Sequence, residues 1–464
     1  MAFYGRDNEL ALLNEILGKN SYQGVLLWGR RHVGKSALIG QSLKVFSGTV
    51  IYYQCLKSDD ETNLKGLVAA YRLGSAYQGE VLFSDIADFF AFVLAREKGK
   101  KVVFVLDEYP YWRETSSLGK EGLDSALQRA IDRVLSASDA KLIISGSYLG
   151  VMEEIQKENN PLAGRLKSKI ALNPLNYLEA ASFYPDYTPL EKIKAYAAFG
   201  GMPYLLEEIN PKKSVDENLR SLYFSSEGSL KKLTPLLADE EVGKKDILFQ
   251  VFTLLCSRTD KPSLADLSSC FSHVSKEWIR QALIELIDMQ LVERVYPLGD
   301  KDKERSAYYR VADNALNYYF RCVKPFENAI LLQAADVAFR SAQALFQKSL
   351  LPQCFERIAA DYLVLSNRGR RQLPFVEIGT YFYNSKGQNG QFDIVAKNSK
   401  GYVFFECKLH TLSAADYAEE RRQIEIIPPY GLHPYLLGFF GLEKGELAQE
   451  KNILVFDSHD LFRL

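Results

Sequence analysis

One eight-residue segment constrains the fold of this chain more than any other feature. The segment Gly29-Arg30-Arg31-His32-Val33-Gly34-Lys35-Ser36 fits the pattern G-x-x-x-x-G-K-[ST] at every fixed position. An apolar run, Gly24 to Trp28, precedes it, and an amphipathic stretch, Ala37 to Leu43, follows it. A strand, a glycine-rich loop and a helix in this order are typical of a phosphate-binding loop in a parallel α/β sheet. The sequence therefore predicts a P-loop fold.

The residue types of this loop suit the phosphates of ATP. Glycines let backbone N–H groups close around phosphate oxygens, and the helix start adds the positive end of its dipole. Lys35 is expected to meet the β- and γ-phosphates, and Ser36 is expected to ligate Mg²⁺. We therefore predict that ATP and Mg²⁺ are bound by Gly29, Arg30, Arg31, His32, Val33, Gly34, Lys35 and Ser36.

A second apolar run, Val102 to Leu106, ends in the two carboxylates Asp107 and Glu108. Open α/β sheets bind ligands at the carboxyl ends of their strands, so we expect both acids at the nucleotide. Asp107 is predicted to hold Mg²⁺, and Glu108 is predicted to orient and polarise the attacking water. The alternative is a strand that merely ends in a solvated Asp-Glu pair.

Two further residues are candidates for the same site. Ser147, after the apolar run Leu142 to Ser145, is predicted to sense the γ-phosphate, with a plain turn former as the alternative. Arg165, after Pro161-Leu162-Ala163-Gly164, is predicted to bring positive charge to the transition state. The alternative for Arg165 is a solvated surface arginine.

The alternation of apolar β-rich runs with amphipathic stretches in the first half predicts a parallel sheet covered on both faces. A chain of 464 residues is too long for one core. We expect further strands at 50–54 and near Ile170, then at 292–296, 307–311, 373–383, 391–396, 402–407 and 435–440. The predicted domains are a P-loop core (1–172), a helical lid (173–240), a winged helix (241–325) and a separate α/β domain (326–464).

Charge and hydropathy exclude several classes of protein. With 57 basic and 58 acidic side chains, no global field attracts nucleic acid or an anionic membrane. The charges of Arg6 and Asp7 interrupt any secretory signal, and no apolar run reaches the roughly 18 residues of a membrane span. We therefore expect a cytoplasmic protein without a membrane partner. The six cysteines lie singly, without the spacing of a zinc site.

At these motifs a resemblance to a known family becomes specific. The chain resembles the DEXX-box ATPases of the AAA family, first noted mainly in archaea and similar to multidomain signalling (STAND-like) ATPases. The resemblance rests on Phe3-Tyr4-Gly5-Arg6-Asp7-Asn8-Glu9-Leu10, the P-loop, Asp107-Glu108, Ser145-Gly146-Ser147 and Gly200-Gly201-Met202-Pro203-Tyr204. It covers essentially the whole chain. It implies a winged helix, a C-terminal domain like restriction endonucleases, and a place for Gly5-Arg6 near the adenine.

Three acids and a lysine stand out in the C-terminal part of the chain: Glu356, Asp393, Glu406 and Lys408. Because strand side chains alternate, Glu406 and Lys408 lie on one face. The pattern is similar to that of PD-(D/E)XK nucleases, with Glu356 as the helix-borne acid. The resemblance implies that Asp393 and Glu406 grip Mg²⁺ while Lys408 positions the nucleophilic water. The alternative is an inert binding or dimerisation module.

Contact with DNA is left open by the sequence. The basic patches Arg368-Gly369-Arg370-Arg371 and Arg421-Arg422 suit phosphate contact or ordinary solvated loops equally. The candidate recognition helix, Ser275 to Gln290, has nearly balanced charges, which favours protein contact or packing within the chain.

These predictions combine into one function. We expect a Mg²⁺-dependent ATPase whose ATP or ADP state repositions the winged helix and the nuclease-like domain. DNA, a protein partner and self-association all stay open. The alternative is a switch for protein interaction that binds nucleotide, hydrolyses it slowly or not at all, and carries an inactive nuclease-like domain.

Overall fold

A five-stranded parallel sheet forms the centre of the N-terminal part of the chain in this computed structural model, which describes residues 3–147, 149–242, 246–258, 260–299, 306–369, 374–385 and 388–463. Its strand order is β2-β3-β4-β1-β5. The strands are β1 (Gln23–Gly29), β2 (Thr49–Gln54), β3 (Val102–Asp107), β4 (Lys141–Gly146) and β5 (Ser168–Leu172). Each lies where an apolar run predicts it.

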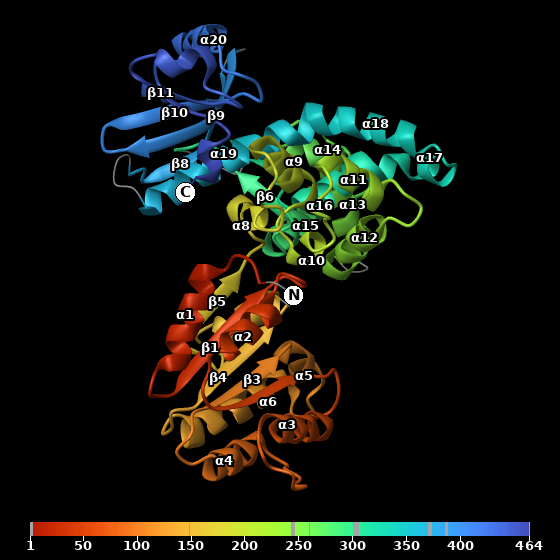
Figure 1. The fold of residues 1–464 in the computed structure, drawn as a ribbon, viewed down its shortest axis with the longest axis vertical. Coiled ribbons are helices and arrows are strands. Elements are labelled where there is room, and N and C mark those ends of the chain that lie inside the picture. Colours follow the sequence, from red (N-terminus) through yellow and green to blue (C-terminus); the bar gives the residue numbers. More distant parts are fainter. Residues whose placement is uncertain are drawn as a thin grey trace. The chain divides into compact units, whose positions relative to one another are not determined.

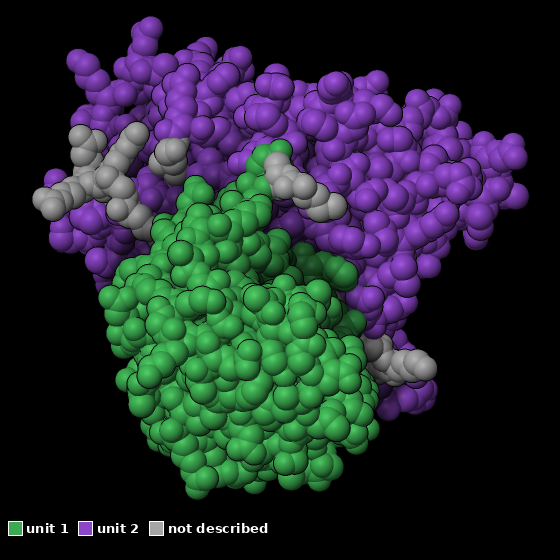
Figure 2. Space-filling model, turned by 60° about the horizontal axis from the view of Figure 1, so that its bottom comes forward, with its two compact units in different colours: residues 1–174 green, residues 175–464 purple. Residues whose placement is uncertain are grey.

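Helices cover this sheet, and the side chains of β3 and β4 are therefore buried along their whole length. Figure 1 shows them packed around the strands. They are α1 (Asp7–Gly18), α2 (Lys35–Leu43), α3 (Asp60–Gly74), α4 (Ile86–Arg96), α5 (Tyr109–Thr115), α6 (Gly119–Ala130), the π-helix η1 (Ile131–Leu135) and α7 (Leu149–Gln156). Residues 1–174 form one compact unit, and residues 175–464 form a second, as coloured in Figure 2.

The second unit begins with helices. Gly200, with φ 67°, ends α9. The helices are α8 (Tyr177–Ala181), α9 (Pro189–Phe199), α10 (Pro203–Leu206), α11 (Val215–Tyr223), α12 (Ser229–Val242), α13 (Asp246–Ser257), α14 (Leu264–Ser269) and α15 (Lys276–Asp288). The domain bounds predicted within this unit, and the lid itself, stay predictions.

A two-stranded antiparallel sheet follows α15. Its strands are β6 (Val292–Val295) and β7 (Tyr308–Val311), in the order predicted for a winged helix, an assignment that stays a prediction. Residues 300–305, between these two strands, lie outside the described residues. The next helices are α16 (Asn314–Tyr318), η3 (Tyr319–Val323), η4 (Lys324–Phe326), α17 (Glu327–Leu331), α18 (Ala335–Leu345), η5 (Phe346–Leu350) and α19 (Leu351–Gly369).

The chain ends in a mixed five-stranded sheet of order β12-β11-β10-β9-β8. Its strands are β8 (Glu377–Ser385), β9 (Gln388–Asn398), β10 (Gly401–Cys407), β11 (Pro434–Phe440) and β12 (Ile453–Phe456), with α20 (Ala414–Glu425) between β10 and β11 and the 3-10 helices η6 (Gly445–Gln449) and η7 (Asp460–Phe462) around β12. The pairs β8–β9 and β9–β10 are antiparallel, whereas β10–β11 and β11–β12 are parallel. The predicted α/β class is confirmed, although the sequence analysis missed β12.

Candidate functional site

The P-loop joins the end of β1 to the start of α2. Gly29 must be glycine, because a Cβ there would collide with the carbonyl of Leu172 on β5. His32 (φ 61°) and Gly34 (φ 97°) adopt left-handed conformations that turn the chain into α2. The first N–H groups of α2 therefore face the open end of the loop, which suits a phosphate group.

Lys35 is buried inside its own loop. Its ammonium group donates hydrogen bonds of 3.0 Å to the carbonyls of Gly29 and Arg30, and it lies 3.7 Å from the Glu108 carboxylate. The loop thus holds a cation where bound phosphates would lie, paired with the acid that follows β3.

Asp107 is the centre of a buried network of hydroxyl groups at the end of β3. The Ser36 hydroxyl donates to its Oδ2 at 2.8 Å, and the hydroxyls of Tyr52 and Ser145 also donate to this carboxylate. Burial, followed by the charge of Asp107, raises the pKa of Tyr52 well above its usual range, which keeps the phenol a donor. Donors from α2, β2 and β4 therefore fix the orientation of Asp107.

Tyr52 was missed by the sequence analysis, which named Ser145 but gave it no role at the site. Tyr52 lies two residues before Gln54, which pairs with Asp107, and Ser145 follows Ile144, which pairs with Leu106. Their position beside Asp107 depends on the strand order, in which β3 lies between β2 and β4. A polar hydroxyl near the end of an apolar strand is the only signal that the sequence offers.

Glu108 adopts a left-handed backbone conformation, with φ 52°, directly after β3. Its Oε2 accepts hydrogen bonds from the Ser147 N–H at 3.1 Å and the Ser147 hydroxyl at 2.8 Å. The carboxylate is thus held between the end of β4 and Lys35. Ser147 lies at the predicted site, and its partner here is Glu108.

The other P-loop residues differ in their surroundings. Arg30 is buried, Arg31 donates to the Tyr111 hydroxyl at 2.7 Å, and His32 is exposed. The carbonyl of Val33, which is buried, accepts from Arg6 at 3.1 Å. Arg6 also donates to the carbonyl of Asn173, so its side chain links the P-loop to the residue that follows β5.

Arg165 lies away from the P-loop. Its guanidinium donates two hydrogen bonds to the carboxylate of Asp132, at 2.9 and 2.8 Å. Its backbone packs against Gly24, near the start of β1, whereas the P-loop follows the end of that strand. The structure therefore does not bring Arg165 to the predicted nucleotide site of this chain, and its role at the transition state stays a prediction.

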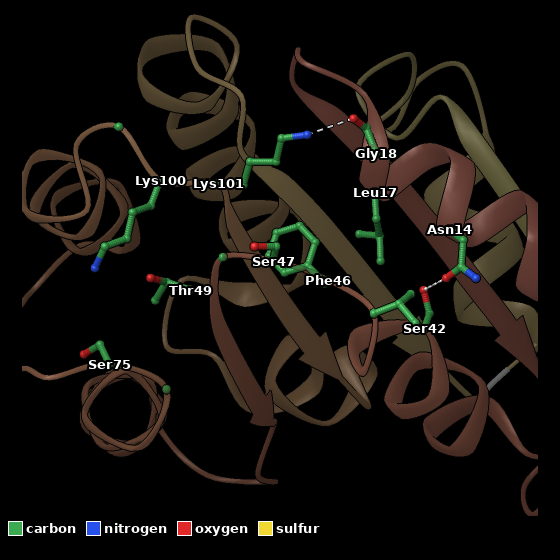
Figure 3. A pocket seen from close by; sticks show the side chains of 14 residues that line it. Asn14, Leu17, Gly18, Ser42, Phe46, Ser47, Thr49, Ser75, Lys100 and Lys101 are labelled. Atoms are coloured by element: carbon green, nitrogen blue, oxygen red, sulfur yellow. Dashed lines mark hydrogen bonds between the residues drawn. The ribbon is translucent and has the colours of Figure 1, made fainter.

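A hollow of unit 1 lies at the amino ends of β2 and β3, whereas the P-loop follows the carboxyl end of β1. Figure 3 shows this space of about 820 Å³, bordered by Thr49 and Lys101, which precede or begin β2 and β3. Lys101 donates to the carbonyl of Gly18 at 2.9 Å, and Ser42 donates to Asn14 at 2.8 Å. This hollow is no part of the nucleotide site.

The second unit brings the four predicted nuclease-like residues into one neighbourhood. Ile394 pairs with Phe405 across β9 and β10, so Asp393 and Glu406 are neighbours in the sheet. The Cys407 N–H donates to Asp393 at 3.1 Å, and Lys408 lies 2.8 Å from Glu406. Glu356, on α19, faces Asp393 closely enough for their charges to interact.

Burial raises the pKa values of these acids. Burial and the charge of Glu356 raise the pKa of Asp393 to about 7, and burial and the charge of Asp393 raise that of Glu406 to about 7. Burial is also the main cause that raises the pKa of Glu356. Burial, followed by the charges of Glu406 and Asp393, raises the pKa of Glu420 on α20 to about 8. The centre therefore holds more negative charge than its surroundings compensate.

Two cations lie near Glu356, Lys261 before α14 and Arg310 on β7, which the sequence analysis did not foresee. Lys261 and Arg310 line the same small cavity as Glu356. Burial lowers the pKa of Lys261, while the charges of Glu356 and Asp393 oppose this shift. The contact follows from docking of the β6–β7 segment on β8, where the Leu298 N–H donates to Thr380 at 2.8 Å.

The acids of this centre do not yet form a metal site. Among the residues that the structure describes, no three His, Cys, Asp or Glu side chains lie close enough to hold an ion. The carboxylate oxygens of Asp393 and Glu406 are ligands of the kind that Mg²⁺ prefers. The uncompensated negative charge of the centre would also attract a cation.

The predicted basic surfaces are only partly described. Arg370 and Arg371 lie outside the described residues, whereas Arg421 and Arg422 are exposed on α20. On α15, the candidate recognition helix, Trp278 is 66% exposed. In the described part of the chain, no helix is long and apolar enough to cross a membrane.

The parallel sheet, the P-loop after β1 and the acidic pair after β3 define the first unit as a P-loop ATPase. Residues 3–209 match the family model described as an ATPase domain predominantly from Archaea, and residues 319–420 match one described as archaeal and bacterial proteins of unknown function. The first of these matches covers nearly all of the first unit, and it supports ATP binding and hydrolysis by this part of the chain.

Individual proteins that resemble this chain share low sequence identity with it. An uncharacterised protein of Methanocaldococcus jannaschii is 25% identical over 99% of both chains. A Walker-type ATPase of Pyrococcus abyssi is 18% identical and covers 68% of this chain and 96% of its own, at a TM-score of 0.49. The ORC2 protein of Aeropyrum pernix, in ADPNP–ADP complexes, is 13% identical and covers 71% and 95%, at a TM-score of 0.49. At these scores the two structures add nothing to the assignment.

Proposed function

We propose that the first unit binds ATP with Mg²⁺ and hydrolyses it through Glu108, and that exchange between ATP and ADP switches the conformation of the chain. The observation that carries this proposal is the 2.8 Å hydrogen bond between Ser36 and Asp107. It joins the P-loop to the acidic end of β3, beside the 3.7 Å approach of Lys35 to Glu108. One small region thus contains a cation for phosphates, ligands for Mg²⁺ and a base.

Each residue has a distinct task in this proposal. Lys35 and the N–H groups of the loop bind the phosphates, and Glu108 orients the attacking water and accepts its proton. Ser36 and Asp107 supply the oxygen ligands that Mg²⁺ prefers. When bound, Mg²⁺ neutralises charge on the phosphate oxygens. Ser147 positions Glu108, while Tyr52 and Ser145 position Asp107.

Replacing Tyr52 by Phe is expected to raise the Mg²⁺ concentration needed for half-maximal ATP turnover by about tenfold, because an outer hydrogen bond orients the metal ligand. A Mg²⁺ titration of the turnover rate measures this shift. The matched control is Tyr53→Phe, since the Tyr53 hydroxyl bonds to Asn63 instead of Asp107. An unchanged Mg²⁺ requirement in Tyr52→Phe would remove the positioning role.

The direct test of the switch is turnover by the purified full chain, with and without double-stranded DNA, together with its ADP content. Steady Mg²⁺-dependent hydrolysis supports an ATPase cycle. Retained ADP with negligible turnover, unaffected by DNA, would instead favour the alternative of a nucleotide-dependent protein-interaction switch. Turnover that DNA stimulates would support DNA as a partner.

A second candidate function belongs to the C-terminal sheet. The neighbouring Asp393 and Glu406, with Lys408 at 2.8 Å from Glu406, support a metal-dependent phosphodiesterase acting on DNA. Asp393 and Glu406 would hold the ion, Lys408 would position the water, and Glu356 would complete the acidic centre.

The double variant Asp393→Asn, Glu406→Gln is expected to abolish cleavage of linear, supercoiled and branched DNA, because both oxygen ligands lose their charge. ATP turnover, carried by a different site, should persist and serves as the control for folding. Cleavage is followed on gels with Mg²⁺ or Mn²⁺. A parent protein that cleaves none of these substrates would favour a binding module over a nuclease.

A further inference from the structure

The buried face of α20 is acidic. The buried residues of this helix are Asp416 and Glu420, one turn apart. Asp416 has an evident task, because its carboxylate accepts from the Ser413 N–H and hydroxyl at 2.8 Å each and contacts His410 at 3.0 Å. It caps the helix and fixes its start. No such task accounts for Glu420.

Glu420 is a buried carboxylate without a partner. The residue is 2% exposed, and among the described residues neither of its carboxylate oxygens has a hydrogen-bond partner. Burying an unpaired carboxylate is energetically costly, so a folded chain seldom leaves one without a counter-charge. The adjacent Glu419 is exposed and needs no such explanation.

The surroundings of Glu420 lack the positive charge that would compensate it. The charges that act on it most strongly are those of Glu406 and Asp393, and the positive charge that opposes them is Lys408. Lys408 is already paired with Glu406 at 2.8 Å. When all are ionised, three carboxylates thus face one ammonium group. Buried carboxylates that lack compensating positive charge suit a divalent cation.

We propose that Glu420 completes a divalent-cation site with Asp393 and Glu406. The inference rests on the acidic centre proposed above and adds a third ligand to it from α20. Carboxylate oxygens select hard cations such as Mg²⁺, Mn²⁺ and Ca²⁺. Since no described trio of ligands is close enough to hold an ion already, binding draws the carboxylates together and ties α20 to β9 and β10.

The test uses the nucleotide-free full chain, with Mn²⁺ as the probe, in an Asp107→Asn background that disables the P-loop metal ligand. Mn²⁺ is expected to bind and to raise the melting temperature. Glu420→Gln should bind Mn²⁺ at least about tenfold more weakly, by analogy with the loss seen when metal-site partners are removed. The matched control Glu425→Gln, which makes the same charge change at an exposed position of α20, should bind like the background protein.

The metal-free melting temperature separates a ligand from a structural carboxyl group. Glu420→Gln should melt above its background without metal, because a buried repulsive charge is removed. Unchanged Mn²⁺ affinity in Glu420→Gln, or a lower metal-free melting temperature, would overturn the proposal. If Glu420→Gln fails to fold, Glu420→Ala replaces it under the same criteria. Absence of Mn²⁺ binding in the Asp107→Asn background would overturn the whole C-terminal centre, while the ATPase proposal would stand.

Discussion

Glu108→Gln is expected to lower ATP turnover at least about a hundredfold, because the variant lacks the base that takes the proton of the attacking water. ATP should still bind, since the P-loop and Asp107 remain. Gln keeps an oxygen that accepts from Ser147, so the side chain can stay in its present position. Loss of negative charge beside the γ-phosphate is expected to leave ATP affinity unchanged or higher.

Single-turnover hydrolysis and calorimetric ATP binding measure the two effects separately. Glu114→Gln is the matched control, because Glu114 lies on α5 and pairs with Lys57 at 3.2 Å instead of a P-loop residue. It should turn over ATP like the parent. A Glu108→Gln variant with the parent's rate would show that another group takes the proton, and the role of the acidic pair after β3 would need revision.

Lys35→Ala is expected to weaken ATP binding at least about a hundredfold. In the proposed site its ammonium group donates hydrogen bonds to the β- and γ-phosphates. Two hydrogen bonds to charged groups contribute about 1.5–3 kcal/mol each, which together exceeds the roughly 2.8 kcal/mol that a hundredfold change in affinity requires. The variant also frees the carbonyls of Gly29 and Arg30, which now accept from Lys35 at 3.0 Å. A slightly lower melting temperature without nucleotide is therefore expected.

Calorimetry with ATP measures the loss, and circular dichroism checks the fold. Lys44→Ala is the control, because Lys44 is exposed at the end of α2 and bonds to Gln41 at 2.8 Å. Its ATP affinity should equal that of the parent. Parent-like affinity in Lys35→Ala would contradict a phosphate-binding lysine, whatever the turnover rate.

The sequence predicted the parts of this protein that depend on local pattern. The strand expected from Gly24 to Trp28 is observed as Gln23–Gly29, and the strand expected before Asp107 is observed as Val102–Asp107. Buried parallel strands are continuous apolar runs, and the P-loop combines a strand end, glycines and a helix start within a few residues. Both signals need no knowledge of distant segments.

Arg165 illustrates the limit of such signals. Its sequence context, a Gly turn before an arginine, is the same for a catalytic residue and for a structural one. Its partner in the structure is Asp132, which lies 33 positions away in the sequence. By contrast, β12 has a local strand signal, the apolar run Ile453–Phe456, and only its place in the sheet depends on its pairing with β11.

The sequence by itself determined the prediction of the nucleotide site, because the residues proposed to bind phosphate and metal are adjacent in the chain or end an apolar strand. Only the tertiary structure decided which groups surround them. Tyr52 and Ser145 reach Asp107 because β3 lies between β2 and β4. Lys261 lies near Glu356 because the β6–β7 segment docks on β8. Glu420 became unusual only once burial without a partner was visible. Pairing between distant segments depends on the free energy of the whole fold, which no local period encodes.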